Sequence, residues 1–448
     1  MKLVATVTEL PFDAALDADI IELRADRLGL GVIPSEVEGS PSRIDAADPS
    51  TALGMTRIRA LTSKPLLLTY RGRAVSEGEV RAALEANIDL VDVEWPPRFD
   101  VGPYRDRVVL SHHDFDGFPD VAALLRDMRA LGCAHTKLAV TPRDFADNET
   151  LLREIAPGVT VIGMGERGLY SRILAPFLGS ELCFAGAKEA AAPGQLTLQR
   201  AREIFGDAPV PHRDGGPPAV FAIAGNPAGH SLSPSIHNRL FREKGANAAY
   251  TIASVERFAE LEDAFLAKRI TGLSITAPFK EEAFRFAQRI GATIGENARD
   301  CEAINTLVHI GGEIVADNTD VDGFTAILAQ LCGRDRKSVA IVGAGGTARA
   351  ALVAVRRAGM HVTVFNRSPR EFVATRPLEE LASFDGEILI DTLPVAIELP
   401  LRATTTLIRA AYTSLPGHPA TRPPDYSGLD LLHAQAQRQH ELFMKAMQ

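Results

Sequence analysis

The chain contains two separate groups of residues that could do chemistry, each built around a lysine. In the first half, Lys137 lies inside the apolar run at residues 136–140 (TKLAV), downstream of the motif SHHDF at residues 111–115. A lysine in a buried strand loses its hydration, which favours the neutral amine, the form that attacks a ketone to give a Schiff base. The alternative is a lysine at a strand end that reaches solvent, and the apolar run alone does not separate the two.

His113 follows a short apolar run and suits general acid–base chemistry near neutral pH. A His-His-Asp cluster could also bind a metal, but no further ligands at a suitable spacing are evident, so we expect no metal site. Glu77, in the EGE loop at residues 77–79, is the candidate partner that orients His113. A solvated loop acid is the alternative for Glu77.

The second group combines a lysine, an acid and a serine-containing turn. Lys280 closes the segment SITAPFK at residues 274–280, just past a predicted strand, and Asp320 lies past another strand. Such a pair could transfer a proton to an alkoxide formed by hydride transfer, or it could be a surface salt bridge. Ser231 and Ser233 lie in a Gly/Pro-rich turn and could bind a carboxylate or polyol, or cap a helix.

A glycine-rich turn predicts a dinucleotide site. The strand at 338–342 runs into GAGGTA at 343–348, and a helix follows. Glycines at such a turn let the backbone approach a pyrophosphate, which the helix N-terminus stabilises. The next strand ends without the acid that an NAD site would prefer, and an arginine there suits the 2′-phosphate of NADP(H). The predicted cofactor-binding residues are Gly343, Gly345, Gly346, Ala348, Asn366, Arg367, Ser368 and Arg370.

The elements that must position the first group form a repeating pattern. Short apolar runs alternate with amphipathic segments, and the predicted strands are 3–7, 20–23, 65–70, 90–93, 108–110, 137–140, 159–162 and 182–185. Eight β/α units over about 200 residues predict a (β/α)8 barrel, whose active site lies at the carboxyl ends of the strands. The side chains found there are Glu22, Arg24, Arg71, Glu94, His113, Lys137, Met164 and Arg172.

Two segments interrupt the pattern of strands and helices. Residues 206–218 are rich in Pro and Gly and predict a linker between domains. Residues 29–59 look like an insertion after the second strand, for which disorder is the first interpretation and a lid over the barrel mouth the alternative.

Composition excludes several classes of protein. The chain has 448 residues, enough for two or three domains, and its net charge of −9 argues against a nucleic-acid binder. No apolar run approaches the roughly 18–20 residues of a membrane helix, and residues 1–9 predict a first strand rather than a signal peptide. The widely spaced cysteines, Cys133, Cys183, Cys301 and Cys332, favour reduced thiols in a cytoplasmic protein.

Residues 1–205 resemble type I 3-dehydroquinate dehydratase. The matching segments are 22–26, 69–71, 111–115, 137–139, 171–172 and 192–195. The resemblance implies that Lys137 forms an imine with the C3 ketone of 3-dehydroquinate. His113, with Glu77 as its partner, would remove the C2 proton and protonate the departing C1 hydroxyl. The expected substrate-binding residues are Glu22, Arg24, Arg71, Arg172 and Gln195, with Met164 at the end of the seventh strand.

Residues 219–448 resemble shikimate dehydrogenase. The matching segments are the serine turn, 276–280, 303–307, 318–320, the glycine turn and 435–436. The resemblance implies a substrate domain at 219–325 with a returning helix at 429–448, around a Rossmann NADP-binding domain at 326–428. Lys280 and Asp320 would transfer the proton while NADPH reduces 3-dehydroshikimate to shikimate. The expected substrate-binding residues are Ser231, Ser233, Thr276, Asn305, Asp320 and Gln435.

The chain departs from the two family patterns at a few positions. Ala191 stands where the dehydratases usually have serine, and Glu77 lies two residues later than the usual spacing from the arginine. Near the predicted nicotinamide end, residues 390–396 (IDTLPVA) replace the usual Asn-x-Thr and Gly-Met pattern. Arg409 replaces an aspartate that usually lies three residues before Tyr412. These last changes predict a slower reductase.

Three functions therefore stay open. The favoured one is a bifunctional enzyme that dehydrates 3-dehydroquinate and then reduces the product with NADPH. A second is a catabolic enzyme whose dehydrogenase half oxidises quinate or shikimate with NAD, which Arg367 disfavours. A third is a dehydratase fused to a non-catalytic ligand-sensing or scaffolding module, which the intact Lys280 and Asp320 disfavour.

Overall fold

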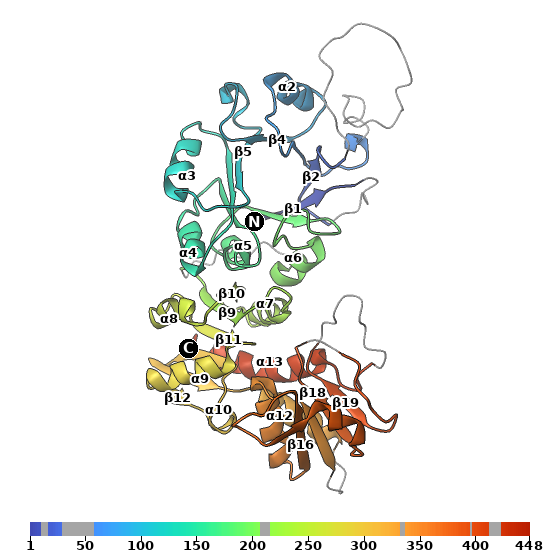
Figure 1. Ribbon diagram of the computed structural model, residues 1–448. Coiled ribbons are helices and arrows are strands. Elements are labelled where there is room, and N and C mark those ends of the chain that lie inside the picture. Colours follow the sequence, from blue (N-terminus) through green and yellow to red (C-terminus); the bar gives the residue numbers. More distant parts are fainter. Residues whose placement is uncertain (10–16, 29–57, 207–215, 332–336, 395–396, 412–422) are drawn as a thin grey trace. The chain divides into compact units, whose positions relative to one another are not determined.

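The computed structural model describes residues 1–9, 17–28, 58–206, 216–331, 337–394, 397–411 and 423–448 (Figure 1). Residues 29–57 of the insertion expected at 29–59 and residues 207–215 of the linker expected at 206–218 lie outside these residues, as does Cys332. Contacts divide the chain into one unit of residues 1–218 and 229–254 and another of residues 219–228 and 255–448. We describe each unit by itself.

The first unit is built on eight parallel strands. They are β1 (Lys2–Val7), β2 (Ile20–Arg24), β3 (Leu66–Thr69), β4 (Leu90–Glu94), β5 (Val108–Asp114), β6 (His135–Val140), β7 (Val159–Gly163) and β8 (Leu182–Gly186). The sheet order is β7-β6-β5-β4-β3-β2-β1-β8, so each strand neighbours the one that precedes it in sequence, and β8 returns to β1. This near-closed sheet confirms the predicted (β/α)8 barrel.

Both faces of these strands are buried, as expected for a parallel sheet covered by helices. One apolar cluster takes residues from at least seven strands, which is the packing of a barrel interior. Its members include Val4, Ile20, Leu67, Val109, Ala139, Ile162 and Leu182. Apolar side chains therefore fill much of the barrel interior.

Helices surround the strands of this unit (Figure 1). They are α2 (Glu77–Glu85), α3 (Val121–Arg129), α4 (Phe145–Arg153), α5 (Leu169–Phe177) and α6 (Leu198–Phe205), with a 3-10 turn η1 (Gly102–Tyr104). Side-chain caps begin most of them: Ser76 and Glu79 form a capping box on α2, and Asp120 caps α3. By their contacts, α7 (Ser233–Glu243) and β10 (Ala248–Ser254) also belong to this unit.

The second unit contains a mixed sheet followed by a parallel one. The mixed sheet runs through β9 (Ala219–Gly225), β11 (Gly272–Ile275), β13 (Thr306–Ile310), β14 (Glu313–Asp317) and β12 (Thr293–Ile294). Strand β13 is antiparallel to both β11 and β14. Its helices are α8 (Ala259–Leu266), α9 (Lys280–Arg289) and α10 (Glu296–Cys301).

The parallel sheet has the order β17-β16-β15-β18-β19. Its strands are β15 (Ser338–Val342), β16 (His361–Asn366), β17 (Thr375–Pro377), β18 (Ile388–Asp391) and β19 (Thr406–Arg409). The accompanying helices are α11 (Asp320–Leu331), α12 (Gly346–Arg357), the 3-10 turn η2 (Leu378–Ser383) and α13 (Gly428–Lys445). This α/β arrangement, with the glycine turn between β15 and α12, confirms the predicted Rossmann-type domain.

Helix α13 returns from the end of the chain to the mixed sheet. Gln439 donates hydrogen bonds to the Asn305 carbonyl at 3.1 Å and to Thr306 Oγ1 at 2.7 Å, and it accepts one from Ser274 at 2.7 Å. None of the helices in the described part of the chain is long and apolar enough to cross a membrane.

Candidate active sites

Lys137 points into the barrel from β6 and is 3% exposed. Its Nζ lies 3.4 Å from Asp92 Oδ2, 3.8 Å from Glu22 Oε1 and 3.9 Å from the centre of the Phe184 ring. A buried cation is tolerable when carboxylates and an aromatic face surround it. The amine is therefore held by fixed partners, and it also borders a cavity.

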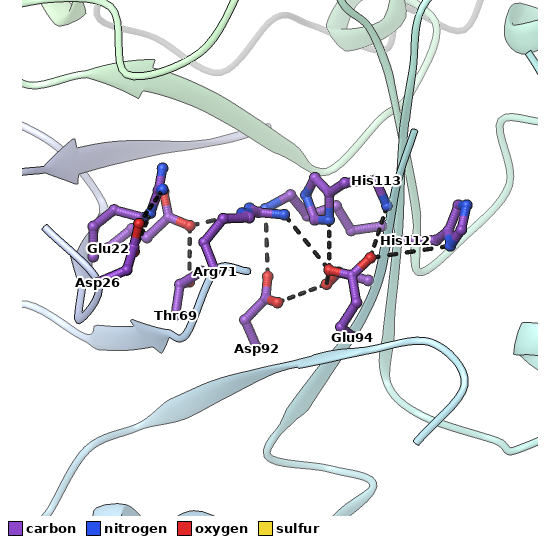
Figure 2. Close-up of polar contacts among 11 residues, drawn as sticks. Glu22, Asp26, Thr69, Arg71, Asp92, Glu94, His112 and His113 are labelled. Atoms are coloured by element: carbon purple, nitrogen blue, oxygen red, sulfur yellow. Dashed lines mark hydrogen bonds and ion pairs between the residues drawn. The ribbon is translucent and has the colours of Figure 1, made fainter. Parts of the chain in front are cut away.

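The two carboxylates near Lys137 are themselves held by hydroxyl groups. Thr69 donates to Glu22 at 2.8 Å (Figure 2). Thr6 donates to the same carboxylate at 2.6 Å, and Ser111 donates to Asp92 at 2.6 Å. Burial opposes ionisation of Glu22, but Lys137 and these hydrogen bonds keep its pKa below the ordinary value. The site thus contains carboxylate charge that can stabilise a cationic nitrogen.

Glu94 holds His113 at two points. Its Oε1 accepts the backbone N–H of His113 at 2.8 Å, and its Oε2 lies 2.8 Å from the ring Nδ1 (Figure 2). The ring Nε2 is buried and has no hydrogen-bond partner among the described residues. Because a carboxylate at Nδ1 requires a proton on that nitrogen, Nε2 carries the lone pair and can act as a base.

The surroundings shift the pKa values of His113 and Glu94. Burial, then the positive charges of Lys137 and Arg71, lower the pKa of His113 well below its ordinary value. Burial and the negative charge of Asp92 raise the pKa of Glu94 to about 7, against the opposing effect of Arg71. His113 is therefore a neutral imidazole near pH 7, while Glu94 titrates in this range.

The structure corrects the expected role of Glu77. Glu77 is the exposed first residue of α2, where its Oε1 accepts a hydrogen bond from the Tyr104 hydroxyl at 3.0 Å. The capping box of Ser76 fixes the start of this helix, where an acid is favourable. The acid that contacts His113 is Glu94, so the predicted Glu77–His113 pair is wrong in this structure.

A cavity of about 360 Å³ brings the predicted barrel residues together. Among its lining side chains are all of the predicted ones except Glu77 and Glu94: Glu22, Arg24, Arg71, His113, Lys137, Met164, Arg172 and Gln195. It also includes Thr6, Asp26, Phe115 and Phe184, which sequence reasoning did not select. Asp92 was missed too, although its position two residues before Glu94 on β4 places both acids on one face of the strand.

The cations of this cavity are held in place by neighbouring groups. Arg24 makes a bidentate pair with Asp26 at 2.8 and 2.7 Å, and Arg71 lies 3.6 Å from Glu94. Arg172 donates from Nε to the Gly163 carbonyl at 3.0 Å, and burial lowers the pKa of Arg172 to about 10, so it stays charged near neutral pH. The guanidinium groups can thus attract a carboxylate.

Gln195 occupies the loop after β8. Its Nε2 donates to Thr6 at 3.1 Å, and its Oε1 accepts the backbone N–H of Ala191 at 2.7 Å. Ala191, where the family usually has serine, therefore contacts the predicted binding residue through its backbone, which does not depend on the side chain.

In the second unit, the predicted Lys280 and Asp320 meet. Lys280 Nζ lies 2.5 Å from Asp320 Oδ2, and both residues are more than nine-tenths buried. Asn305 donates to the other carboxylate oxygen, Oδ1, at 2.9 Å. A surface salt bridge is excluded by this burial, and the acid is fixed from both sides.

A short network extends from this pair to α13. The Asn305 Nδ2 also donates to Thr319 Oγ1 at 2.9 Å, and the Thr319 hydroxyl donates to Gln435 Oε1 at 2.8 Å. Asn305 and Gln435 were expected here, and Thr319 was missed. Its position between Asn318 and Asp320 in the NTD motif was the available signal.

The remaining predicted substrate residues lie near the ends of strands or helices. Ser233 is the first residue of α7, and its Oγ lies 3.2 Å from that of Ser231. These serines belong to the first unit. Thr276 directly follows β11 and is half-buried.

The glycine turn fits a dinucleotide. Gly343 has φ of +100°, a backbone conformation that favours glycine, and an added Cβ would lie 2.6 Å from Thr392 Oγ1. A Cβ added at Gly345 would meet nothing within 4 Å, so this position is open to a ligand. Ala348 is buried at 4% exposure in the first turn of α12, where backbone N–H groups are available to a phosphate.

The end of β16 carries the groups expected to select the cofactor. Asn366 donates from Nδ2 to the Ser368 carbonyl at 2.8 Å, which folds the turn back on itself. Arg367, Ser368 and Arg370 are exposed. Exposed guanidinium groups after this strand suit the 2′-phosphate of NADP(H).

Asp391 and Arg409, two positions near the predicted nicotinamide end where the chain departs from the family pattern, contact each other. Asp391 ends β18, Arg409 ends β19, and the two are partners in the parallel register. Arg409 Nε donates to Asp391 Oδ2 at 3.1 Å, and both side chains are buried. Val395, Ala396 and Tyr412 lie outside the described residues.

Comparison with known proteins gives matches for both halves. Residues 4–207 match the model of the type I 3-dehydroquinase family, and residues 223–307 match that of the shikimate dehydrogenase substrate binding domain. A shikimate dehydrogenase (NADP(+)) of Vibrio cholerae is 35% identical over 213 residues, which cover 46% of this chain and 73% of that protein.

Bifunctional proteins match across both halves. The chloroplastic bifunctional 3-dehydroquinate dehydratase/shikimate dehydrogenase of Arabidopsis thaliana is 27% identical over 345 residues, covering 68% of this chain. This chain spans 56% of that relative's length. A solved structure of dehydroquinate dehydratase and shikimate dehydrogenase from S. pombe AroM is 21% identical, with a TM-score of 0.38 over 100% of this chain and 98% of that one.

Residues 4–207 therefore match the type I 3-dehydroquinase family, and the chain belongs to the shikimate dehydrogenase family.

Proposed function

We propose that this chain catalyses two consecutive steps toward shikimate: dehydration of 3-dehydroquinate to 3-dehydroshikimate, then NADPH-dependent reduction to shikimate. The observation that carries the proposal is the presence of two complete sets of reactive groups. Lys137 and the unpartnered His113 Nε2 border one cavity, and the buried Lys280–Asp320 pair lies beside a glycine turn.

The domains that we propose follow these sets. Residues 1–205 form the dehydratase, 206–218 the linker, and 219–325 with 429–448 the substrate domain of the dehydrogenase, around the cofactor domain at 326–428. The family matches at 4–207 and 223–307 support the boundary between the first two activities. We propose the cytoplasm as the compartment, which the unpaired Cys133, Cys183 and Cys301 support.

In the dehydratase, Lys137 Nζ attacks the C3 ketone, and loss of water gives an imine. The imine is a better electron sink than the ketone, so a C2 proton becomes acidic enough for His113 Nε2 to remove it. The resulting enamine expels the C1 hydroxyl, which takes a proton from His113 and leaves as water. Hydrolysis of the imine then releases 3-dehydroshikimate and restores Lys137.

The acids around these two residues have separate roles in the proposed reaction. Glu22 and Asp92 supply the negative charge that stabilises a protonated imine on Lys137, at present distances of 3.8 and 3.4 Å. Glu94 holds the His113 ring and its proton on Nδ1.

The substrate's carboxylate and hydroxyls need partners in the same cavity. We assign the cationic side chains Arg24, Arg71 and Arg172 and the amide of Gln195 to this role, because all four border the cavity. Met164 supplies an apolar wall, since it is 2% exposed and borders the same space.

In the reductase, Lys280 delivers a proton to the oxygen at C3 of 3-dehydroshikimate, and Asp320 holds the ammonium in position. NADPH supplies the hydride when it is bound. Thr276, Asn305 and Gln435 bind the hydroxyls and carboxylate of the substrate. The resemblance to shikimate dehydrogenase implies the same role for Ser231 and Ser233. Asn305 also holds the second oxygen of Asp320, which keeps that acid from turning toward solvent.

Two assays test the proposal. Borohydride reduction in the presence of 3-dehydroquinate should attach the substrate skeleton to Lys137, as peptide mass spectrometry will show. An unlabelled Lys137, together with full dehydration by Lys137→Ala, would rule out the imine.

The second assay follows NADP⁺ reduction by shikimate. Turnover with NADP⁺ supports the reductase, and turnover with NAD⁺ and quinate instead would favour the catabolic alternative. Binding of shikimate without turnover by either cofactor would favour the ligand-sensing module.

A further inference from the structure

We propose that Thr347 and Gly346 of the glycine turn position the Lys280 ammonium, so that the turn which binds the cofactor also holds the proton donor. The proposal rests on the reductase function proposed above. It assigns Thr347 a positioning role and gives Gly346 a purpose other than contact with the dinucleotide.

The first observation is a direct contact between the proton donor and the turn. Lys280 Nζ donates to Thr347 Oγ1 at 2.9 Å and lies 2.5 Å from Asp320 Oδ2. Lys280 begins α9, whereas Thr347 lies in the first turn of α12. The side chain therefore bridges from the mixed sheet's helix layer to the nucleotide-binding turn.

The second observation concerns the space that Gly346 leaves. A Cβ added to Gly346 would lie 2.8 Å from Lys280 Cβ and 2.9 Å from Lys280 Cδ, closer than real side chains approach. Gly346 is not among the glycines with positive φ in the described chain, so backbone conformation does not require it. The missing side chain makes room for the aliphatic stem of Lys280.

The neighbouring glycines have different reasons. A Cβ at Gly345 would meet nothing within 4 Å, and one at Gly343 would meet Thr392 rather than Lys280. The three glycines therefore have different structural roles. Gly343 adopts a left-handed backbone conformation, Gly345 leaves open space, and Gly346 leaves room for the Lys280 side chain.

The Lys280–Thr347 contact also offsets the repulsion between the Lys280 ammonium and the N-terminus of α12. The N-terminus of α12 carries a positive partial charge, which repels an ammonium. Thr347 Oγ1 offers a lone pair between them, and Asp320 supplies the opposite charge. An ammonium has three N–H donors; two are taken by Thr347 and Asp320, which directs the third to a substrate oxygen.

The test compares Thr347→Val, which keeps the shape but removes the acceptor, with Thr347→Ser, which keeps the hydroxyl. With shikimate and NADP⁺, we expect Thr347→Val to lower kcat about tenfold, the scale of one lost hydrogen bond to a charged group. The Kd of NADP⁺ should change less than twofold, and Thr347→Ser should restore most of kcat. Gly346→Ala should likewise lower kcat, because its methyl group displaces the lysine stem.

Two results would overturn the proposal. One is an unchanged kcat in Thr347→Val, and the other is a Kd for NADP⁺ that weakens in step with kcat, which would make Thr347 an ordinary cofactor contact. A folding defect of the cofactor domain in Thr347→Val would appear as a lowered Tm together with a weakened Kd for NADP⁺, which is the second of these results.

A second readout does not depend on turnover. Acetylation of Lys280 by acetic anhydride, followed by peptide mass spectrometry, should be several-fold faster in Thr347→Val than in the unmodified chain or Thr347→Ser. Equal rates would contradict the positioning role. If the unmodified chain does not reduce NADP⁺ at all, the proposed reductase function fails, whereas the labelling rates still decide whether Thr347 holds Lys280.

Discussion

Replacement of Glu94 by glutamine tests which acid holds His113, the proposed general base of the dehydratase. Glu94 accepts both the backbone N–H and the ring Nδ1–H of His113, each at 2.8 Å. Glutamine has nearly the same shape but only one acceptor oxygen, so one of these N–H groups would face an amide N–H₂. Loss of one hydrogen bond to a charged group costs about 1.5–3 kcal/mol. We therefore expect kcat/KM for dehydration to fall about 10- to 150-fold.

The pH profile gives this prediction a second readout. With the pKa of Glu94 at about 7, its carboxylate accepts the Nδ1 proton above this pH, and Nε2 is free to act as a base. Below pH 7 the protonated acid donates to Nδ1 instead, and the ring proton moves to Nε2. The pKa of His113 lies well below its ordinary value, so protonation of the ring does not cause a loss of dehydratase activity near pH 7.

The size of the pH effect follows directly. One pH unit below the pKa, about one tenth of Glu94 is ionised, so dehydratase kcat/KM should be about tenfold below its plateau at high pH. In Glu94→Gln this limb should disappear, because an amide does not titrate.

The assay records the ultraviolet absorbance of the conjugated product, 3-dehydroshikimate, without NADPH. Glu77→Gln is the matched control, since it neutralises an exposed acid on α2 that contacts Tyr104 rather than His113. The reasoning fails if Glu94→Gln keeps the rate and acid limb of the unmodified chain while Glu77→Gln loses them.

Three further changes test other parts of the molecule. Arg409→Met leaves the buried Asp391 carboxylate without its cationic partner, which should lower the free energy of unfolding by about 3–5 kcal/mol. Burial raises the pKa of Asp391, so proton uptake relieves the charge at low pH, and the drop in Tm should be larger at pH 8 than at pH 5; an equal drop would contradict this. Arg367→Ser should lower the ratio of kcat/KM for NADP⁺ to that for NAD⁺ at least about tenfold, and an unchanged ratio would show that another group binds the 2′-phosphate. Gly163→Ala places a Cβ against Ser171 Oγ and should displace Arg172, which donates to the Gly163 carbonyl. We expect a raised KM for 3-dehydroquinate with NADP⁺ reduction unaffected; an unchanged KM would remove Arg172 from substrate binding.

The strands of the barrel were predictable because buried parallel strands are apolar on both faces. The fifth strand was predicted at 108–110 and extends to Asp114, since polar residues such as His112 and His113 still pair with β6 in the ladder. Hydrophobicity marks the part of a strand that packs in the core, whereas backbone pairing sets its end.

The partner of His113 was not predictable in the same way. Glu77 was chosen from its place in a loop, but the contact depends on which residue of β4 lies beside β5. Glu94 and Ser111 are register partners, which brings the Glu94 side chain to the strand that carries His113. The spacing of Asp92 and Glu94 showed that they share a face, whereas the register between strands is set by tertiary packing.

The two departures in the cofactor domain illustrate the same limit. Asp391 and Arg409 are 18 positions apart, and each taken alone looks like the loss of a family residue. In the fold they end adjacent parallel strands and neutralise each other. The expectation of a slower reductase stays a prediction, but these two changes form a compensated pair.

The most direct test supplies the purified chain with 3-dehydroquinate and NADPH and follows both compounds. The account predicts that shikimate accumulates and that one NADPH is oxidised for each 3-dehydroquinate consumed. Lys137→Ala should block this conversion while still reducing added 3-dehydroshikimate. Accumulation of 3-dehydroshikimate with NADPH left unoxidised would contradict the claim that one chain performs both steps.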